Sequence, residues 1–414
     1  MPQSLKITAA TIDPAFLDLP WDVPLEEWPE SVLAPLPRGI SRHIVRFARV
    51  SGEIVAIKEI SLHVAQREYN LLRSLDKMDV PSVEPLAVIG GRRSPDGEEL
   101  NAALATKHLQ YSLPYRAVFS QHMRPETALR LIDALAVLMV RLHLLGFYWG
   151  DVSLSNTLFL RDAGSFAAYL VDAETGELHE KLTKGQRDYD VDLARTNIIG
   201  ELMDLQAGGM LAEDEDVIAI GNLIFERYHS LWEEVTGETV IAANERWRVT
   251  DRINRLNELG FEVDEISIDT DDDGDHVRLR PKVVDAGHFH RKVMRLTGLD
   301  VEENQARRML NDLDEYRWIT NQLDEPIELV AHEWLATIYT PTLQMVPKEL
   351  RSRLSGPQLF HEILEHRWYM SQRQGRDVPT WEAVKSYAED YLANQRDERV
   401  FMATTQELPK IATE

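Results

Sequence analysis

A long apolar helix that leads directly into a polar loop limits the folds open to this chain. Residues 125–146, "PETALRLIDALAVLMVRLHLLG", begin with a proline at a favoured helix start and end at a glycine. The apolar positions 131, 132, 135, 138, 139, 142 and 145 form a broad stripe at helical spacing, so this helix should be mostly buried. The next segment, "GFYWGDVSLSNTLFL", nevertheless carries Asp151 and Asn156 before another apolar run. Polar side chains at such a place call for a chemical explanation.

The residues ahead of this helix are rich in strands. At about residues 40–60, "SRHIVRFARVSGEIVAIKEI" contains two β-rich runs joined at "SGE", which predicts a hairpin. Next, "VAQREYNLLRSL" places apolar residues at helical spacing, and "VEPLAVIG" and "ELNAALATKHL" read as a second hairpin around the turn-rich "GRRSPDG". The first hundred residues therefore predict the order strand, strand, helix, strand, strand, and the whole chain reads as an α+β protein.

Five polar residues occur along these predicted elements in a particular order. They are Lys58 in "VAIK", Glu68 in "REYNLL", Asp151 and Asn156 in the loop after the buried helix, and Asp172 at the end of an apolar strand. In this order they resemble the protein-kinase-like fold family. The resemblance covers roughly residues 37–200 and is closest to the small bacterial lipopolysaccharide-kinase and aminoglycoside-phosphotransferase-like branch, where "GD" replaces "RD". The rest of the chain resembles an uncharacterised bacterial C-terminal domain that accompanies such regions.

The resemblance implies an ATP- and Mg²⁺-dependent phosphotransferase, in which charge is neutralised and the reactants are aligned. Lys58 would contact the phosphates and is a catalytic candidate together with Asp151, which would orient the acceptor hydroxyl and take its proton. Asn156 and Asp172 would bind the metal, because Mg²⁺ prefers oxygen ligands. The candidate nucleotide-binding residues are Lys58, Glu68, Gly39, Ser41, Arg42, Lys107 and Leu109.

The chain departs from the family pattern at several points. The nucleotide-covering loop "LPRGISRHIV" has only one glycine, and Trp149 occupies the position usually held by histidine. "DAE" replaces "DFG", and no motif marks the end of an activation segment, so we do not expect a loop controlled by phosphorylation. Downstream, "DYDVDLARTNI" offers Asp190 or Asp192 as a hydrogen-bond acceptor for the catalytic loop, with a helix N-cap as the equal alternative.

These features predict a bilobal protein-kinase-like fold followed by a mostly helical domain with a β-hairpin. We expect a Pro- and acid-rich N-terminal extension over residues 1–36, a β-rich N-lobe over 37–110, a helical C-lobe over 111–210, a C-terminal domain over 211–400 and a tail over 401–414.

Two motifs in the C-terminal half imitate metal sites. "DTDDDGD" (269–275) matches the start of a calcium loop, but Arg280 stands where a bidentate glutamate is required, so we expect an acidic hairpin tip. In "FHEILEHRW" (360–368), His361 and His366 point apart on a helix because they are five residues apart. We expect them to form i,i+4 surface pairs with Glu365 and Glu362 instead.

A cluster of arginines and aromatics lies near the end of the same predicted helix. Its members are Arg367, Trp368, Tyr369, Arg373 and Arg376. Two interpretations stay open, a recognition surface for an anionic substrate or partner and an ordinary helix surface with solvated arginines.

Composition restricts the partners and the compartment. The chain has 45 Lys and Arg against 69 Asp and Glu, a net charge of −24, so we expect no nucleic-acid partner. The absence of cysteine fits a reducing compartment. The first residues lack the layout of a signal peptide, and no apolar run reaches the ~18 residues that span a bilayer. We therefore expect a cytoplasmic protein without a membrane span.

Three functions are compatible with these patterns. We favour an ATP- and Mg²⁺-dependent phosphotransferase whose C-terminal domain selects the acceptor, either a small molecule or a protein. The alternatives are a nucleotidyl transferase on the same fold and a nucleotide-binding pseudokinase scaffold. The presence of all five polar parts favours an enzyme, whereas the glycine-poor loop favours the scaffold.

Overall fold

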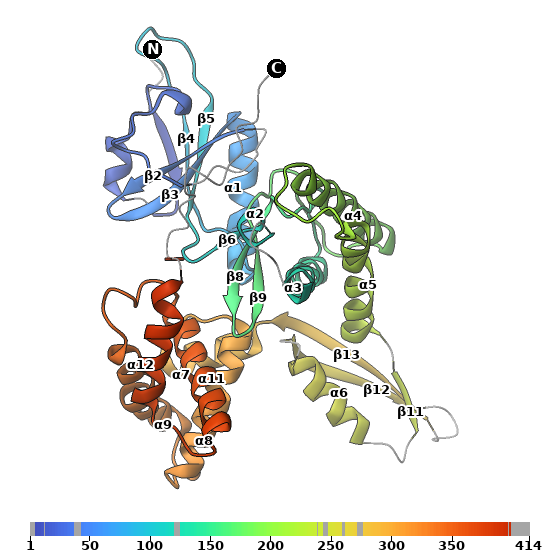
Figure 1. Cartoon of the computed structure of the whole chain (residues 1–414). Coiled ribbons are helices and arrows are strands. Elements are labelled where there is room, and N and C mark those ends of the chain that lie inside the picture. The colour runs from blue at the N-terminus through green and yellow to red at the C-terminus, as the bar shows by residue number, and fades with distance from the viewer. Residues whose placement is uncertain are drawn as a thin grey trace. The chain divides into compact units, whose positions relative to one another are not determined.

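The computed structural model of the chain (Figure 1) describes residues 5–11, 13–36, 43–119, 125–237, 239–242, 247–258, 261–270, 276–395 and 397–398. The chain divides into two compact units. Unit 1 comprises residues 1–159, 168–225 and 400–414, and unit 2 comprises residues 160–167 and 226–399. Among the helices of the described residues, none combines the length and the apolar character needed to cross a bilayer.

Unit 1 begins with a five-stranded antiparallel sheet in the order β1–β4–β5–β3–β2. The strands are β1 (Lys6–Ala9), β2 (Ile44–Val50), β3 (Glu53–Ile60), β4 (Pro85–Gly90) and β5 (Ala102–Lys107). Ser51 and Gly52 join β2 to β3 with positive φ angles of 48° and 87°, which suits a two-residue hairpin turn. Both hairpins expected from the sequence are confirmed.

The N-terminal extension is part of this sheet and its core. β1 pairs with β4, and the following residues form two short 3₁₀ helices, Pro14–Asp18 and Leu25–Glu27. Trp21 and Trp28 stack edge to face at 5.2 Å and join the core cluster that covers Val55 and Ile57 of β3. The extension therefore buries one face of the sheet.

A fully buried arginine fixes the extension in place. The side chain of Arg92 donates to the carbonyls of Trp21 (3.0 Å), Val23 (2.6 Å) and Asn101 (2.9 Å), and it forms an ion pair with Glu59 at 2.6 Å. The same guanidinium binds acceptors in the extension and in the sheet, so loss of Arg92 should destabilise the packing of the extension on the sheet.

Helix α1 (Leu62–Lys77) contacts β4 and β5. Successive strand residues point to opposite faces, so Ile57 enters the core under the extension while Lys58 points to the other side. This alternation brings Lys58 within reach of Glu68 on α1.

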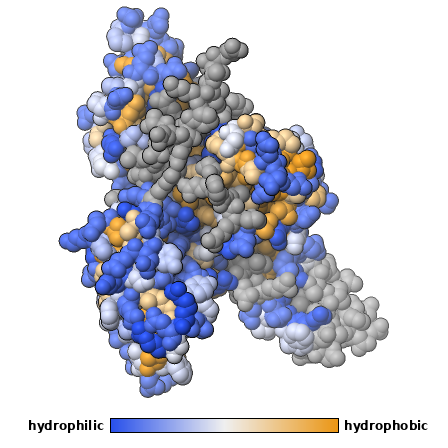
Figure 2. All heavy atoms as spheres, viewed as in Figure 1, coloured by the Kyte–Doolittle hydropathy of each residue, from blue (hydrophilic) through white to orange (hydrophobic). Residues whose placement is uncertain are grey.

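The rest of unit 1 is mainly helical. Its helices are α2 (Tyr115–Phe119), α3 (Pro125–Leu144), α4 (Lys184–Ala207) and the first half of α5 (Val217–Thr236). Short strands lie between them: β6 (Leu113–Pro114), β7 (Phe147–Tyr148), β8 (Thr157–Asp162), β9 (Ser165–Leu170) and β10 (Glu177–Leu178). Helix α3 is buried along its predicted stripe at positions 131, 132, 135, 138, 139 and 142. Exposed hydrophobic side chains on α4 and α5 include Met203, Ile218 and Phe225. Figure 2 shows orange hydrophobic surface over the side of the molecule where these two helices lie.

Unit 2 combines a small sheet with helices. The sheet has the order β11–β13–β12, from β11 (Thr239–Ala242), β12 (Phe261–Thr270) and β13 (His276–Ala286). The helices are α6 (Trp247–Glu258), α7 (His288–Thr297), α8 (Glu303–Ile319), α9 (Ile327–Trp334), α10 (Thr340–Met345), α11 (Gly356–Gln374) and α12 (Thr380–Asp390). A π-helical segment, Leu335–Tyr339, joins α9 to α10. A last 3₁₀ turn spans Leu392–Asn394. The α+β class and the mostly helical C-terminal part are confirmed, as is the β12–β13 hairpin, whose tip at 271–275 lies outside the described residues.

Of the two pairs expected on α11, His361 with Glu365 is present and His366 with Glu362 is not, and the expected surface position of both histidines is wrong. Both histidines are buried, with His361 6% and His366 9% exposed. His366 contacts the Ser386 hydroxyl at 3.0 Å rather than Glu362, whose carboxylate accepts from Gln358 at 2.9 Å. His361 does lie 3.9 Å from Glu365, but its ring packs inside the unit because α12 and α8 cover this helix. The spacing of charged residues on α11 could not predict that α8 and α12 pack against the face that carries these histidines.

Candidate active site

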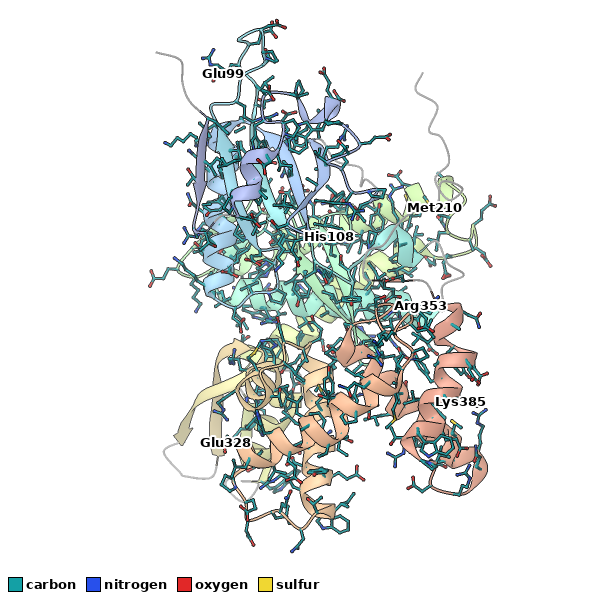
Figure 3. The ribbon with its side chains drawn as sticks, turned by 90° about the vertical axis from the view of Figure 1, so that its left-hand side faces the viewer. Glu99, His108, Met210, Glu328, Arg353 and Lys385 are labelled. Carbon is teal, nitrogen blue, oxygen red and sulfur yellow. The ribbon has the colours of Figure 1, made fainter. Side chains whose placement is uncertain are left out.

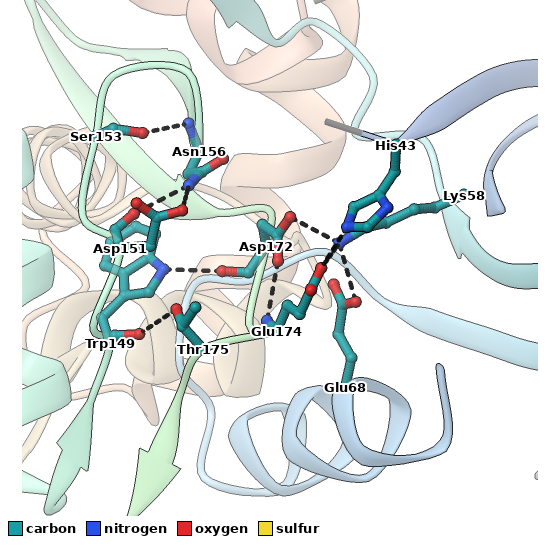
Figure 4. A network of polar contacts seen from close by, with 10 residues as sticks. All are labelled: His43, Lys58, Glu68, Trp149, Asp151, Ser153, Asn156, Asp172, Glu174 and Thr175. Carbon is teal, nitrogen blue, oxygen red and sulfur yellow. Dashed lines mark hydrogen bonds and ion pairs between the residues drawn. The ribbon is translucent and has the colours of Figure 1, made fainter. Parts of the chain in front are cut away.

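The five polar residues singled out from the sequence form two adjoining groups, and Lys58 is the centre of the first (Figure 4). Its Nζ lies 3.1 Å from Glu68 Oε2, 2.7 Å from Asp172 Oδ2 and 3.1 Å from Glu174 Oε2. An ammonium group has three protons, so three carboxylates from α1 and from the segment after β9 can each accept one. One largely buried cation, 13% exposed, thus holds together a strand, a helix and a loop.

Burial and charge act against one another in this group. Burial disfavours the ammonium form of Lys58, but the attraction of Glu68 and Asp172 outweighs it and raises the pKa of Lys58 above its ordinary value. Burial and the neighbouring carboxylate of Asp172 raise the pKa of Glu68 to about 7, although Lys58 opposes the shift. The group has more negative charge than its single lysine can neutralise.

Two members of the group were missed by the sequence analysis, Glu174 and His43. The Glu174 carboxylate lies 2.9 Å from His43 Nε2, and its backbone N–H donates to Asp172 Oδ1 at 2.9 Å. His43 immediately precedes β2, far from Glu174 in the sequence. Glu174 stands in "DAE", two residues after Asp172, and that proximity was the available signal.

The second group is the loop that carries Asp151 and Asn156. The amide nitrogen of Asn156 donates to the carbonyl oxygen of Asp151 at 2.9 Å and to its carboxylate at 3.1 Å. The Asn156 backbone N–H donates to Ser153 Oγ at 3.1 Å. Because the amide nitrogen faces Asp151, the carbonyl oxygen Oδ1 of Asn156 is its available ligand atom. In Figure 4, Asp172 lies between this pair and Lys58.

Side chains of helix α4 form hydrogen bonds with the backbone of this loop. Asp190, which is fully buried, accepts from the backbone N–H groups of Trp149 (2.9 Å) and Gly150 (2.8 Å), and His143 Nε2 lies 3.0 Å away. The loop-bracing interpretation of Asp190 is therefore confirmed. The N-cap of α4 is Thr183, whereas Asp192 is exposed and pairs with Arg195 at 2.7 Å.

Two more residues of α4 hold the same loop. The Glu201 carboxylate accepts from the backbone N–H groups of Leu154 (2.7 Å) and Ser155 (2.9 Å). Asn197 donates to the carbonyl of Val152 at 2.9 Å. Asp190, Asn197 and Glu201 are spaced by seven and four residues, which places them on one helical face. That spacing was visible in the sequence, but its meaning depends on knowing which loop the face touches.

Trp149 links the loop of Asp151 and Asn156 to the segment that carries Asp172. Its indole Nε1 donates to the carbonyl of Asp172 at 2.8 Å, and its own carbonyl accepts from the Thr175 hydroxyl at 2.8 Å. The indole is 1% exposed. A tryptophan in the place of the usual histidine thus holds the two segments together through the N–H of its ring.

The donor set fits a hard divalent cation. Glu68, Asp172 and Glu174 each offer a carboxylate oxygen, and these atoms lie within 4.8 Å of one another. Oxygen donors with excess negative charge suit Mg²⁺. Asp172 belongs to this set, and Asn156 Oδ1 is an additional oxygen donor from the loop.

The remaining nucleotide candidates lie elsewhere or outside the described residues. Gly39, Ser41 and Arg42 are outside them. Lys107, at the end of β5, is exposed, and its ammonium lies 3.8 Å from Glu84, so the side chain is not part of the Lys58 group. The Leu109 carbonyl accepts from the Ser112 hydroxyl at 2.6 Å. A nucleotide-binding role for these residues stays a prediction.

Comparison with known families identifies two regions. Residues 46–199 match the lipopolysaccharide kinase (Kdo/WaaP) family, and residues 230–392 match a domain of unknown function (DUF4032). The resemblance inferred from the sequence is thereby confirmed, and the match supports an enzyme of the kinase type.

Two further comparisons, with solved structures and with curated proteins, do not extend these two family matches. Among solved structures, WaaP in complex with acyl carrier protein matches with 16% identity and a TM-score of 0.37, over 61% of this chain and 99% of that chain. The search of curated proteins found no match.

Proposed function

We propose that this chain, which joins a lipopolysaccharide-kinase-family domain to a domain of unknown function, transfers a phosphoryl group from ATP to an acceptor hydroxyl with the help of Mg²⁺. The observation that supports this most is the group at Lys58. The largely buried cation Lys58, a helix carboxylate and Asp172 come from three separate elements, and the Asp151–Asn156 loop adjoins them. A scaffold that only bound other proteins would have no physical need for this arrangement.

Each residue has a role that follows from its position. Lys58 would bind phosphate oxygens, and Glu68, only 2% exposed, would keep the ammonium directed toward the site. Asp172 and Asn156, with Glu174 as a further candidate, would hold Mg²⁺, which supplies neutralisation of the phosphate charge. Asp151 would orient the acceptor hydroxyl and accept its proton.

The loop is preorganised for this work. The carboxylates of Asp190 and Glu201 bind four backbone N–H groups of residues 149–155, so Asp151 sits on a segment whose backbone is fixed from both sides. Such positioning matters in phosphoryl transfer, where alignment and charge neutralisation provide most of the rate enhancement. Because the donor is ATP, we place the reaction in the cytoplasm, with a small molecule or a protein as the acceptor.

Nucleotide binding provides the first test. Mg-ATP should raise the melting temperature of the wild type, because a ligand that binds only the folded state stabilises it. Asp172→Ala should lose most of this rise, whereas Asp188→Asn, a change to a half-exposed carboxylate of α4 that pairs with Lys184, should keep it. An equal rise in the wild type and Asp172→Ala would contradict the assignment. Mass analysis of the product then separates phosphoryl transfer from nucleotidyl transfer.

A further inference from the structure

The β8–β9 hairpin carries the two predicted metal ligands at its open end. Asn156 directly precedes β8, and Asp172 follows the last residue of β9 by two positions. The closed end, residues 160–167, belongs to unit 2. We propose that the domain of unknown function sets the position of this hairpin, and thereby of Asn156 and Asp172, through hydrogen bonds and an ion pair to residues 161–163. This inference rests on the proposed function and assigns a role to the second domain within it.

The strongest contact of the tip is made by Asp162, which is 2% exposed. Its carboxylate accepts from the backbone N–H groups of Asn304 (3.0 Å) and Gln305 (2.8 Å), and from the Asn304 side chain at 2.8 Å. These groups belong to the first turn of α8, where unpaired N–H groups and the helix dipole favour an anion. Asp162 thus caps a helix more than 140 residues away in the sequence.

Arg161 makes the second contact. Its guanidinium forms a two-pronged pair with the Glu398 carboxylate, with distances of 2.8–3.0 Å. Glu398 is itself held, because its backbone N–H donates to the carbonyl of Arg353 at 2.9 Å. The guanidinium of Arg353, which is labelled in Figure 3, in turn donates to the carbonyls of Leu392, Ala393 and Gln395. The pair is therefore anchored to the end of the helical domain.

The backbone of the tip makes the third contact. The Ala163 N–H donates to Gln358 Oε1 at 3.1 Å, and Gln305 donates to the same oxygen at 3.0 Å and to the Arg161 carbonyl at 2.8 Å. Ala163 and Gly164 have positive φ angles of 49° and 85°, which form a tight turn. Three successive residues are thus bound by α8, α11 and the segment after α12.

These contacts exceed what a short hairpin needs for itself. The hairpin is extended only by the two-residue strand β6, which pairs with β8. Such a small sheet is marginally stable by itself, so a tip bound at three consecutive residues also restrains both strands. Since Asn156 and Asp172 stand at the opposite ends of the same two strands, a loosened tip should weaken metal-dependent nucleotide binding more than metal-independent binding. Arg161 and Asp162 are therefore positioning residues and do not touch substrate.

The test compares three variants in the full chain by titrating Mg²⁺ at a fixed ATP concentration and following the melting temperature. Asp162→Asn places an amide N–H against the N–H groups of α8, and Arg161→Ala removes the pair with Glu398 from a side chain that is one third exposed. Asp312→Asn is the matched control, because this carboxylate of α8 accepts from the Trp334 indole at 2.6 Å and does not touch the hairpin.

We expect Asp162→Asn and Arg161→Ala each to need about fivefold more Mg²⁺ for half of the ATP-induced rise, the lower end of typical coupling between sites. Stabilisation by ATP with EDTA should match the wild type, and Asp312→Asn should titrate as the wild type does. Wild-type Mg²⁺ dependence in Arg161→Ala would overturn the inference, whether or not Asp162→Asn folds. If the variants lost metal-free ATP binding as much as Mg²⁺-dependent binding, the contacts would serve only the general stability of the fold, and the inference would also be overturned. Absence of any ATP effect in the wild type would instead refute the proposed function, and the inference with it.

Discussion

Replacement of Asp190 by alanine tests how the loop that carries Asp151 is held. The buried carboxylate accepts from the backbone N–H groups of Trp149 and Gly150 and contacts His143. Its removal leaves the buried N–H of Trp149 and the partly buried N–H of Gly150 without this acceptor, and each loss costs about 1–3 kcal/mol. The expected loss is therefore about 2–6 kcal/mol, a large part of the ~5–15 kcal/mol that stabilises a domain.

The matched control stands two residues away on the same helix. Asp192 is exposed and makes a surface pair with Arg195, so Asp192→Ala should change stability by no more than about 0.5–1 kcal/mol. Urea unfolding followed by tryptophan fluorescence, together with calorimetry, measures both variants. Asp190→Ala should unfold at a clearly lower urea concentration than Asp192→Ala. Indistinguishable midpoints would refute the claim that Asp190 braces the loop.

Three further perturbations follow from the contacts. Glu174→Gln should strengthen metal-free ATP binding by about fivefold to tenfold in calorimetric titration, because one carboxylate fewer competes with phosphate for Lys58; weaker binding would contradict this. Arg92→Leu should cost about 3–5 kcal/mol and speed proteolysis of the N-terminal extension, whereas the exposed neighbour change Arg93→Leu should do neither. Arg373→Glu with Arg376→Glu should preserve folding, since both side chains are exposed, and should reduce transfer only if the arginine–aromatic cluster recognises the acceptor.

The candidate site could be predicted because its parts are short strings on regular elements. Lys58 lies on a strand, Glu68 on the next helix, and Asp151 after a helix with a clear apolar stripe. The order of these residues along predictable elements indicated the site. The residues that complete the site are different. His43 reaches Glu174 across 131 residues, and only the folded chain brings such pairs together.

The role of the N-terminal extension was also beyond the sequence patterns. Its Pro- and acid-rich composition is typical of a loop, yet Trp21 and Trp28 are buried because the sheet offers them an apolar face. Arg92 stands in a turn-rich string of polar residues, where an arginine is normally solvated. It is buried because carbonyl groups from the extension and the carboxylate of Glu59 converge on it. Contacts of this kind depend on tertiary packing rather than on local propensity.

The most direct test of phosphoryl transfer measures ATP turnover and ATP affinity in parallel for the wild type and Asp151→Asn. If Asp151 orients the acceptor and takes its proton, the variant should bind Mg-ATP as tightly as the wild type and turn over at least about a hundredfold more slowly. Asp188→Asn controls for the loss of a carboxylate at the surface. Phosphate release, with an added acceptor or as slow hydrolysis, provides the rate. Equal turnover by the wild type and Asp151→Asn would contradict the assignment of this chain as an ATP-dependent phosphotransferase that uses Asp151.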